Sequence, residues 1–228
     1  MGRLDIFLVE NNLIPTRSRA KRAILYGLVK VNGKFIRKPA SSVKKSDKVE
    51  ILDELATKSV GYWKLQAILN SIDLELFKST DRVLDLGSSA GGFLEFVAKR
   101  CQKVYGVEIS DEFAPQLYYL KQKYPNISVQ ITDAFKLDPR NLPDFGQIDT
   151  LLIDLTLDPS DSIKILEKFL LSLKPQGYII MAIKIGDRSP NEYKKNVKAS
   201  FKTLNLKILR ILDIDPEKKE LHVIAQKQ

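Results

Sequence analysis

Charged side chains stand at the ends of four apolar segments of this chain, at Glu108, Asp133, Asp154 and Lys184. A charge at the end of a buried strand is costly unless it is paired or functional. Pairing of Asp154 with Lys184 for stability alone is one interpretation. The other is a polar site at one edge of a sheet, and the glycine-rich segment that precedes these residues favours it.

The segment Val83–Phe93 passes from an apolar, β-branched run into a helical pattern through Gly87, Gly91 and Gly92. Glycines let a backbone turn tightly and lie close to a ligand. A dinucleotide site would prefer G-x-G-x-x-G, and no phosphate-binding Lys-Ser/Thr follows here. The loop therefore suits a nucleoside without phosphates, and S-adenosylmethionine is the expected cofactor. The residues expected to bind it are Asp85, Gly87, Ser88, Ala90, Gly91, Gly92, Phe93, Glu108, Ile109, Asp133, Ala134 and Asp154.

Two of these carboxylates have expected partners on a nucleoside. Glu108 ends the second strand-like segment, where an acidic residue is placed to accept hydrogen bonds from ribose hydroxyls. Asp133 could accept a hydrogen bond from the adenine amino group, and Phe135 could pack on the ring. The sequence thus predicts a cofactor pocket built from several strand ends.

Positive charge is concentrated near the start of the chain. Residues 1–52 hold 12 Lys and Arg against four Asp and Glu, whereas the other residues hold 25 against 24. A small unit with nearly all of the excess charge indicates an anionic partner, with RNA or DNA favoured.

Composition argues against several other classes. With 228 residues and 44% hydrophobic residues, the chain has enough apolar content for packed cores. The longest apolar runs are too short to span a bilayer, and the first residues show no secretory pattern. One cysteine, Cys101, and one histidine argue against a disulfide framework and a zinc site, so we expect a cytoplasmic protein without a bound metal.

The first 52 residues predict a small α+β unit. Residues 3–12 and 17–25 have helical spacing, Thr16 can cap the second helix, and Asn32-Gly33 is a strong hairpin signal. A short polar stretch follows and is interpreted as a linker. The expected parts of the chain are 1–52 for the small domain, 53–60 for the linker and 61–228 for the second domain.

Strand and helix patterns alternate along the second domain, which predicts a parallel sheet with right-handed crossovers. The last two strands, joined around Asp215-Pro216, are expected to form a hairpin, so that the terminal strand is reversed. This α/β architecture resembles the Rossmann-like methyltransferase fold, in which ligands bind beyond the carboxyl ends of the strands. The expected strands are 83–87, 103–109, 127–131, 148–155, 178–185, 206–214 and 220–226, and the expected helices are 62–72, 92–100, 115–124, 160–173 and 190–204.

The small domain resembles the RNA-binding domain of ribosomal protein S-four, which also occurs in pseudouridine synthases and bacterial tyrosyl-tRNA synthetases. The resemblance rests on Arg3-Leu4-Asp5, Thr16-Arg17-Ser18, Gly27–Gly33, Lys38-Pro39 and Asp47-Lys48-Val49. It implies structured RNA as the ligand, held through phosphates that position it without reading its sequence. The cations expected to contact the RNA are Arg3, Arg17, Arg19, Lys21, Arg22, Lys30 and Lys34.

The second domain resembles the FtsJ-type RNA ribose 2′-O-methyltransferases. Lys64, Asp154, Lys184 and Glu220 occur in the order of the Lys-Asp-Lys-Glu tetrad of that family. Together, the two domains look like the TlyA (haemolysin) family. The resemblance implies S-adenosylmethionine-dependent methylation of ribosomal RNA, with ribosomal RNA or ribosomal subunits as the partner.

The chain departs from this family ahead of Lys64, where Val60-Gly61-Tyr62-Trp63 replaces the usual residues. Near the end of the chain, His222 shares a face of the last strand with Glu220, and either residue could complete the site.

The resemblance also implies a mechanism. A ribose hydroxyl must lose its proton as it attacks the sulfonium methyl group. A desolvated Lys184 flanked by Lys64 is expected to have a lowered pKa and to act as general base, with Asp154 orienting it.

Two other methyltransferase chemistries fit these residues less well, and one function of a different class remains. An exocyclic-amine methyltransferase would show Asn/Asp-Pro-Pro-aromatic after the fourth strand, and Asp154-Leu155-Thr156-Leu157 lacks both prolines. A carbon-5 pyrimidine enzyme needs a cysteine nucleophile, and Cys101 is expected away from the crevice. The second hypothesis is an RNA-binding or ribosome-assembly factor that keeps the donor pocket with weak or no turnover.

Overall fold

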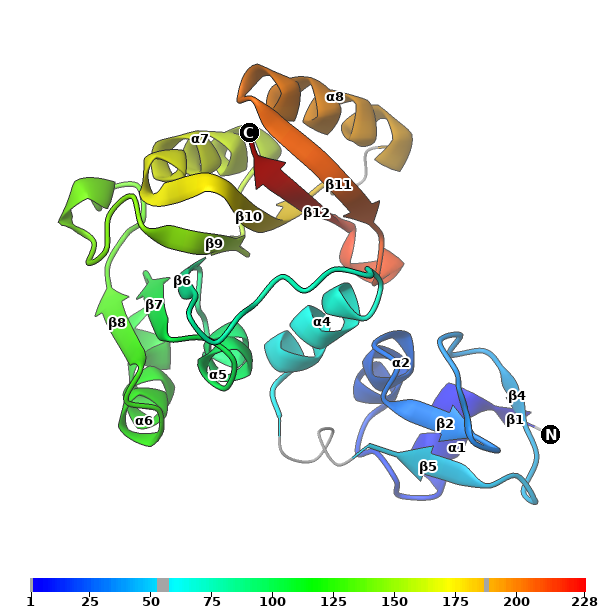
Figure 1. The fold of residues 1–228 in the computed structure, drawn as a ribbon. Coiled ribbons are helices and arrows are strands. Elements are labelled where there is room, and N and C mark those ends of the chain that lie inside the picture. Colours follow the sequence, from blue (N-terminus) through cyan, green and yellow to red (C-terminus); the bar gives the residue numbers. More distant parts are fainter. Residues whose placement is uncertain (1, 53–57, 187–188) are drawn as a thin grey trace. The chain divides into compact units, whose positions relative to one another are not determined.

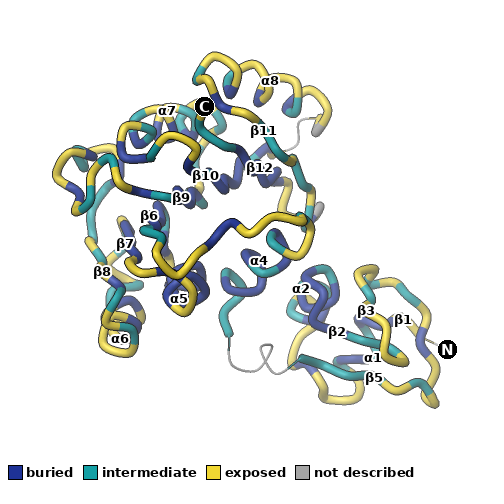
Figure 2. The backbone as a smooth tube through the Cα atoms, in the orientation of Figure 1, coloured by how far each residue is buried: buried dark blue, intermediate teal, exposed yellow. Residues whose placement is uncertain are grey.

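The computed structural model describes residues 2–52, 58–186 and 189–228 (Figures 1 and 2). The chain divides into two compact units, Met1–Ser71 and Ile72–Gln228. Helix α4 (Val60–Leu69) falls in the first unit, although the sequence analysis assigned it to the second domain. Residues 53–57 of the expected linker lie outside the described residues.

The first unit contains the helices and hairpin that the sequence predicts. The second helix covers Arg17–Leu25 as expected, and the Thr16 side chain accepts a hydrogen bond from the backbone N–H of Arg19 at 3.3 Å. Asn32 and Gly33 both have positive φ, 51° and 78°, as a type I′ turn requires. Its elements are β1 (Gly2–Arg3), α1 (Leu4–Glu10), α2 (Arg17–Leu25), β2 (Val29–Val31), β3 (Lys34–Phe35), β4 (Ser42–Val43), β5 (Val49–Ile51) and α4.

The core of the first unit includes one face of each of its first two helices. Leu4 and Leu8 of α1 are fully buried, as are Ala20, Ala23 and Ile24 of α2. Spacings of three and four residues put these side chains on one face of each helix, and that face packs into the core.

Seven strands of the described chain form the sheet of the second unit, in the order β11-β12-β10-β9-β6-β7-β8. β12 runs antiparallel to β10 and β11, and the other neighbouring strands are parallel. The predicted α/β sheet with one reversed terminal strand is therefore confirmed. The strands are β6 (Arg82–Leu86), β7 (Lys103–Glu108), β8 (Ile127–Ile131), β9 (Ile148–Ile153), β10 (Leu173–Lys184), β11 (Leu206–Leu212) and β12 (Glu220–Lys227).

Helices cover both faces of this sheet, with α7 and α8 on one face and α5 and α6 on the other (Figure 1). Phe169 of α7 and Val197 and Phe201 of α8 pack into the core against β9, β10 and β12. No helix in the described ranges is long and apolar enough to cross a membrane. The helices are α5 (Gly92–Ala98), α6 (Ala114–Lys123), α7 (Pro159–Phe169) and α8 (Pro190–Thr203), with short 3-10 turns at Asp111–Phe113, Pro139–Asn141, Leu170–Ser172 and Pro216–Lys218.

The chain changes direction across the sheet between β8 and β9. It moves outward from β6 through β7 to β8, and then returns to the other side of β6 to form β9. Such a reversal opens a crevice at the carboxyl ends of the central strands. Gly87 turns the chain there with a φ of 88°, and a Cβ on it would lie 2.8 Å from the backbone oxygen of Asp154. A side chain at this position would both strain the turn and collide with the neighbouring strand end.

Candidate active site

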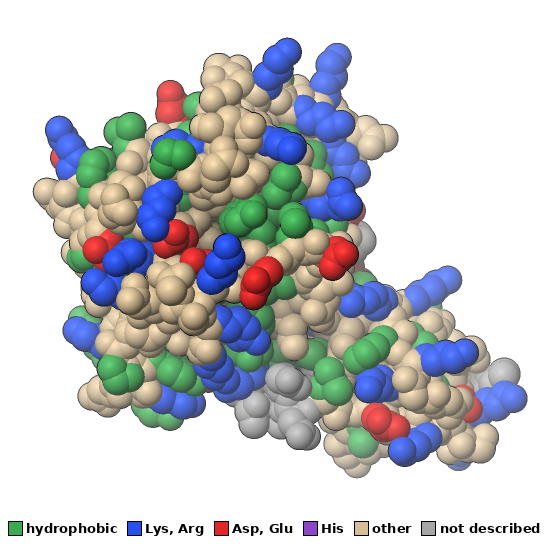
Figure 3. Space-filling view, in the orientation of Figure 1, with side chains coloured by type: hydrophobic (Ala, Val, Ile, Leu, Met, Phe, Trp, Pro, Cys, Tyr) green, Lys and Arg blue, Asp and Glu red, His purple; other side chains and the backbone are tan. Residues whose placement is uncertain are grey.

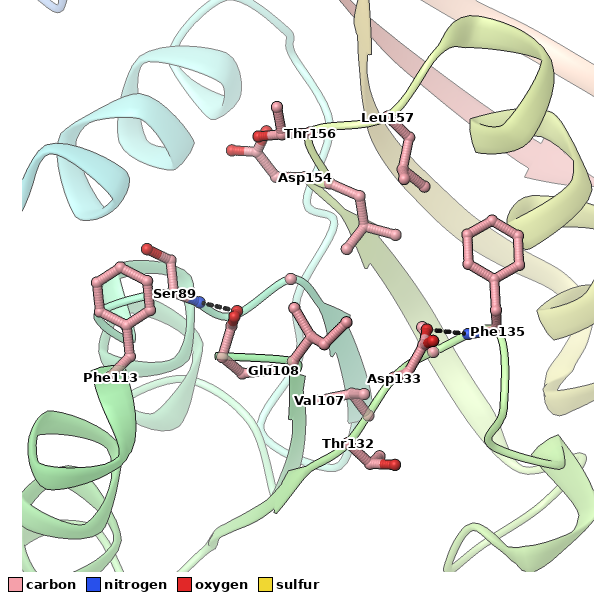
Figure 4. A pocket seen from close by; sticks show the side chains of 14 residues that line it. Ser89, Val107, Glu108, Phe113, Thr132, Asp133, Phe135, Asp154, Thr156 and Leu157 are labelled. Carbon is pink, nitrogen blue, oxygen red and sulfur yellow. Dashed lines mark hydrogen bonds between the residues drawn. The ribbon is translucent and has the colours of Figure 1, made fainter. Parts of the chain in front are cut away.

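A cavity of about 350 Å³ lies at the carboxyl ends of β6, β7, β8 and β9 (Figure 4). Its volume falls in the range of ordinary small-molecule sites, about 300–1,000 Å³. Its walls are Gly87, Ser89, Val107, Glu108, Ile109, Phe113, Thr132, Asp133, Ala134, Phe135, Asp154, Leu155, Thr156 and Leu157. The predicted cofactor residues that line it are Gly87, Glu108, Ile109, Asp133, Ala134 and Asp154.

Glu108 joins the glycine loop to the end of β7. One carboxylate oxygen accepts a hydrogen bond from the Ser89 N–H at 2.7 Å, and the other accepts from the Ser110 N–H at 2.9 Å (Figure 4 shows the first). The side chain is only 7% exposed. Each oxygen has a second lone pair, so the carboxylate can accept further hydrogen bonds from hydroxyl groups in the cavity.

The far wall of the cavity suits a planar ring. Asp133 accepts a hydrogen bond from the Phe135 N–H at 2.8 Å, which holds its carboxylate at the cavity (Figure 4). Ile109 and Phe135 line the cavity and remain 65% and 44% exposed. Large apolar side chains left exposed beside a hydrogen-bond acceptor form a surface that an aromatic heterocycle can cover.

The remaining predicted cofactor residues do not line the cavity. Gly91 has a φ of 78°, and a Cβ on it would lie 2.2 Å from Cδ1 of Leu120. This glycine therefore lets α5 pack closely against α6, and its contact with the cofactor stays a prediction. Ser88 donates from its hydroxyl to the Asp85 carbonyl at 3.2 Å. The predicted cofactor residues that are not among the cavity walls are Asp85, Ser88, Ala90, Gly91, Gly92 and Phe93.

Asp85 lies on β6 and is fully buried. Neither of its carboxylate oxygens has a hydrogen-bond partner among the described residues. Burial, together with the nearby carboxylates of Asp154 and Glu108, raises the pKa of Asp85 to about 7. Asp85 is therefore partly protonated near neutral pH, and an orphaned buried carboxyl group stands directly behind the glycine loop.

Lys184, Asp154 and Glu220 form one cluster beside the cavity. Lys184 ends β10 and lies opposite Glu220, the first residue of β12. Its Nζ is 2.8 Å from Oδ1 of Asp154 and also donates a short hydrogen bond to Oε2 of Glu220. Asp154 belongs both to this cluster and to the cavity wall. The structure thus brings together three of the four residues of the predicted tetrad.

The expected lowering of the Lys184 pKa is wrong. Burial by itself lowers the pKa, but the charges and hydrogen bonds of Asp154 and Glu220 outweigh it, and the pKa is raised. The sequence analysis considered Asp154 alone as a partner. The second carboxylate arrives through the antiparallel pairing of β10 with β12 and adds to the effect of Asp154.

His222 lies behind Glu220, away from the lysine. Its Nε2 is 3.4 Å from Oε1 of Glu220, and the ring is 1% exposed. Between the two residues that the sequence left open, Glu220 is the one that contacts Lys184.

Lys64 lies on α4 and belongs to the first unit. Its place in the tetrad stays a prediction. On the same helix, Trp63 lies under the guanidinium of Arg19, 4.8 Å from its ring centre. One of the cations predicted to bind RNA therefore contacts the indole within its own unit.

Two other cations of the first unit are fixed by a buried carboxylate. Asp5 accepts from Nε of Arg3 at 2.9 Å and from Nε of Arg17 at 3.1 Å. Asp5 is fully buried, whereas the arginines are 43% and 55% exposed. The hydrogen bond from Arg3 outweighs burial and, with Arg17, lowers the pKa of Asp5. A charged Asp5 therefore holds two guanidinium groups at the surface.

The other predicted RNA contacts have varied surroundings. Lys30 lies over the Phe35 ring at 4.6 Å. Lys34 is exposed, and Lys21 and Arg22 are half-buried.

Sequence reasoning missed several functional positions. Asp5 belongs to the motif Arg3-Leu4-Asp5, but nothing in the sequence indicates that it anchors Arg3 and Arg17. Leu155 and Leu157 flank Thr156 directly after Asp154, so their position beyond a strand end could have identified them as cavity walls. Phe113 comes from a 3-10 turn after β7, and its sequence context carries no comparable signal.

Comparison with known families matches both parts of the chain. Residues 2–49 match the model of the S4 domain, and residues 57–207 match that of the FtsJ-like methyltransferase. The second match covers more than half of the 228 residues. The chain belongs to the FtsJ-like methyltransferase family.

Curated relatives of this FtsJ-like chain carry related names. The putative rRNA methyltransferase YqxC of Bacillus subtilis is 28% identical over 68% of this chain and 56% of its own length. The 16S/23S rRNA (cytidine-2′-O)-methyltransferase TlyA of Mycobacterium tuberculosis is 29% identical over 68% of this chain and 57% of its own. The chain spans about half the length of the curated relatives that it matches.

Solved structures share the fold of this FtsJ-like protein. A putative hemolysin from Streptococcus thermophilus covers 99% of this chain and 88% of its own, with a TM-score of 0.62 and 19% identity. Fibrillarin of Aeropyrum pernix, solved with natively bound S-adenosyl-L-methionine, covers 72% and 75% at a TM-score of 0.60 and 25% identity. With the observed sheet order, these likenesses establish a Rossmann-like methyltransferase fold.

Proposed function

We propose that this protein transfers a methyl group from S-adenosylmethionine to a ribose 2′-oxygen of ribosomal RNA. The observation that carries the proposal is the double role of Asp154, which lines the cavity and also holds Lys184 at 2.8 Å. A nucleoside pocket and a cation between two carboxylates thus share one residue. The names of the relatives YqxC and TlyA support RNA as the substrate class.

The cavity walls fit the cofactor. Glu108 would accept hydrogen bonds from the ribose hydroxyls, Asp133 would accept from the adenine amino group, and Ile109 and Phe135 would cover the ring. Pocket and donor match in chemistry, because the walls offer acceptors and apolar surface rather than phosphate-binding cations. S-adenosylmethionine, when bound, supplies an electrophilic methyl group on a sulfonium.

The raised pKa of Lys184 gives this residue a different role from the one expected from the sequence. As an ammonium group it would donate a hydrogen bond to the ribose 2′-oxygen and stabilise the negative charge that develops there. The hydroxyl proton leaves as the oxygen–carbon bond forms, and it would pass to the carboxylate of Asp154 or Glu220. The carboxylates also orient the lysine, which fixes the position of the ribose oxygen in line with the methyl group.

The first unit would hold the RNA through its phosphates. Arg3 and Arg17 are exposed and oriented by Asp5, so their outward N–H groups can reach phosphate oxygens. Lys34 adds an exposed cation. A ribosomal RNA substrate would place the protein's work in the cytoplasm.

The chemistry can be tested with labelled S-adenosylmethionine and ribosomal subunits, followed by digestion and mass analysis of the RNA. The expected product is a 2′-O-methylated nucleoside. A methylated base would contradict the proposal. Absence of transfer would favour the second hypothesis, a binding or assembly factor without turnover.

The role of Lys184 can be tested by the dependence of the single-turnover rate on pH. A lysine that must lose its proton before reaction would give a rate that rises about tenfold per pH unit below its pKa. A lysine that acts as a cation gives no such rise from its own ionisation. We expect the second behaviour.

A further inference from the structure

Positive charge is also concentrated on α8 and β11 of the second unit. The nearly balanced charge of residues 53–228 as a whole conceals this local excess. Residues 190–212 contain six basic residues and one acidic residue, Glu192. The rest of 53–228 then holds 19 basic and 23 acidic residues. The six cations, here named the α8–β11 surface, are Lys194, Lys195, Lys198, Lys202, Lys207 and Arg210.

The cations of this surface lack acidic partners. In the part of the chain that the structure describes, none of the six lies within salt-bridge distance of a carboxylate. Some lysines elsewhere in the same unit are paired, as Lys164 is with Asp161 at 2.8 Å and Lys174 with Asp149 at 2.7 Å. Unpaired like charges three and four residues apart repel each other along a helix. The stripe on α8 therefore opposes helix stability unless an anion compensates it.

The helix presents these charges outward in a row. Tyr193, Val197 and Phe201 form the buried face of α8, whereas the lysines at 195, 198 and 202 are exposed. Seven residues of helix separate the first and last of these three, about 10 Å along the axis. Figure 3 shows Lys and Arg side chains spread over this part of the surface.

A bulge in β11 extends the row around the edge of the sheet. Lys207 lies opposite Gln226 and Arg210 lies opposite Ile224, so one extra residue of β11 puts both cations on one face. Glu220 points to that same face of β12, because it is an even number of residues away from both partners. Arg210 stands four β12 residues from the level of Glu220, about 13 Å along the strand. Lys207 and Arg210 therefore lie on the face of the sheet that Glu220 shares, whereas α8 packs on the other face, and the surface continues around the β11 edge of the sheet.

We propose that the α8–β11 surface binds the phosphate backbone of the RNA beside the methyl-transfer site. The inference deepens the proposed function and rests on it for the identity of the polyanion. Lysine ammonium groups contact phosphates as point charges without reading bases. A membrane surface fits less well, because the apolar face of α8 is used in the protein core and none is left to enter a bilayer.

The test uses the full chain with three substitutions on α8, Lys195→Gln, Lys198→Gln and Lys202→Gln. Glutamine keeps the helix propensity and removes the charge. The matched control carries Lys78→Gln, Lys121→Gln and Lys164→Gln, three exposed lysines elsewhere in the same unit. The probe is a fluorescent RNA hairpin with a single-stranded loop, titrated at several salt concentrations. If the three lysines contact phosphates, the salt slope should fall by about 2 and affinity at low salt by about tenfold, with the control unchanged.

Equal RNA affinity and slope for the α8 variant and the wild type would overturn the inference. An equal loss in the control variant would also overturn it, since net charge alone would then explain the effect. Vesicles of phosphatidylserine and phosphatidylcholine form a second probe, and α8-dependent binding to vesicles but not to RNA would reject the RNA assignment. A second variant, Lys207→Gln with Arg210→Gln, tests the surface without changing the helix.

Methyl transfer separates this inference from the proposed function. If the wild-type protein methylates ribose and both variants bind RNA normally, the inference about the α8–β11 surface is refuted and the proposed function stands. If RNA binding depends on these charges but no methyl group is transferred, the proposed function is refuted and the inference about the surface stands.

Discussion

Asp5 in the first unit and Asp85 in the second are both fully buried, but they have opposite protonation behaviour. The hydrogen bond from Arg3 outweighs burial at Asp5 and, with Arg17, lowers its pKa. Burial without any cation raises the pKa of Asp85 to about 7. The contrast shows that a solvent-inaccessible carboxyl group stays charged where cations reach it from the surface.

Lys184 inverts the arrangement at Asp5. One carboxylate between two arginines leaves an excess positive charge near solvent, which suits a phosphate ligand. One ammonium between Asp154 and Glu220 leaves an excess negative charge beside the cavity, which suits a proton acceptor. Under the proposed function, the same kind of ion cluster serves binding in one unit and chemistry in the other.

The largest expected effect comes from removing the cation between the two carboxylates. Lys184→Met should lower the rate of methyl transfer by about 10²- to 10⁴-fold, because the hydrogen bond to the ribose oxygen matters most in the transition state. Affinity for S-adenosylmethionine should stay near the wild-type value in calorimetry. Lys174→Met is the matched control, since it removes a lysine paired with Asp149 outside the cavity wall. A Lys184→Met enzyme with a near-normal rate would refute the catalytic role.

Asp85→Asn should remove a pH dependence of stability in the second unit. The folded pKa of Asp85, about 7, lies above its ordinary value of 3.8, so its favourable contribution is complete below about pH 4. That contribution is lost as the pH rises toward 7, by at most about 4 kcal/mol. Denaturant unfolding followed by circular dichroism at several pH values should therefore show wild type losing stability relative to Asp85→Asn over this window. Parallel curves for the two proteins would contradict the raised pKa.

Asp5→Asn should destabilise the first unit by about 2 kcal/mol, because three charge-assisted hydrogen bonds, two from Arg3 and one from Arg17, are weakened or lost. The pKa of Asp5 is lowered, so the contribution of the wild-type carboxylate is present above about pH 4 and disappears as the pH falls through the lowered pKa. Trp63, the one tryptophan of the chain, lies in this unit and reports its unfolding by fluorescence. Affinity for an RNA hairpin should fall as well, since Arg3 and Arg17 lose their orientation. Glu10→Gln, an exposed substitution in α1, is the control, and an equal effect of both changes would speak against a special role of Asp5.

Glu108→Gln should have the smallest effect. It replaces a charged acceptor by a neutral one, which should weaken binding of S-adenosylmethionine by about 1 kcal/mol. Calorimetry measures this loss, and the exposed Glu112→Gln serves as the control. Unchanged affinity of Glu108→Gln for S-adenosylmethionine would contradict a role of Glu108 in binding the cofactor.

Much of the fold could be predicted because local signals agree with the tertiary structure. Thr16 caps α2, Asn32-Gly33 closes a hairpin, and alternating apolar runs mark the strands of the sheet. β10 begins five residues before the expected start. The sequence did not predict this part of the strand, because the segment Lys174–Gly177 has the composition of a turn. Gln176 has a φ of 63° and the register with β9 shifts there, so the strand continues through a local irregularity.

The sequence by itself determined the order of strands and helices, the turn at Gly87 and the charge of the first 52 residues. These properties depend on residue types and short spacings. Only the tertiary structure decided how many carboxylates contact Lys184. Lys184 lies 30 residues from Asp154 and 36 from Glu220 along the chain, yet it contacts both. A pKa depends on such distances in space, and the carboxylates of Asp154 and Glu220 together outweigh burial and reverse the shift expected for Lys184.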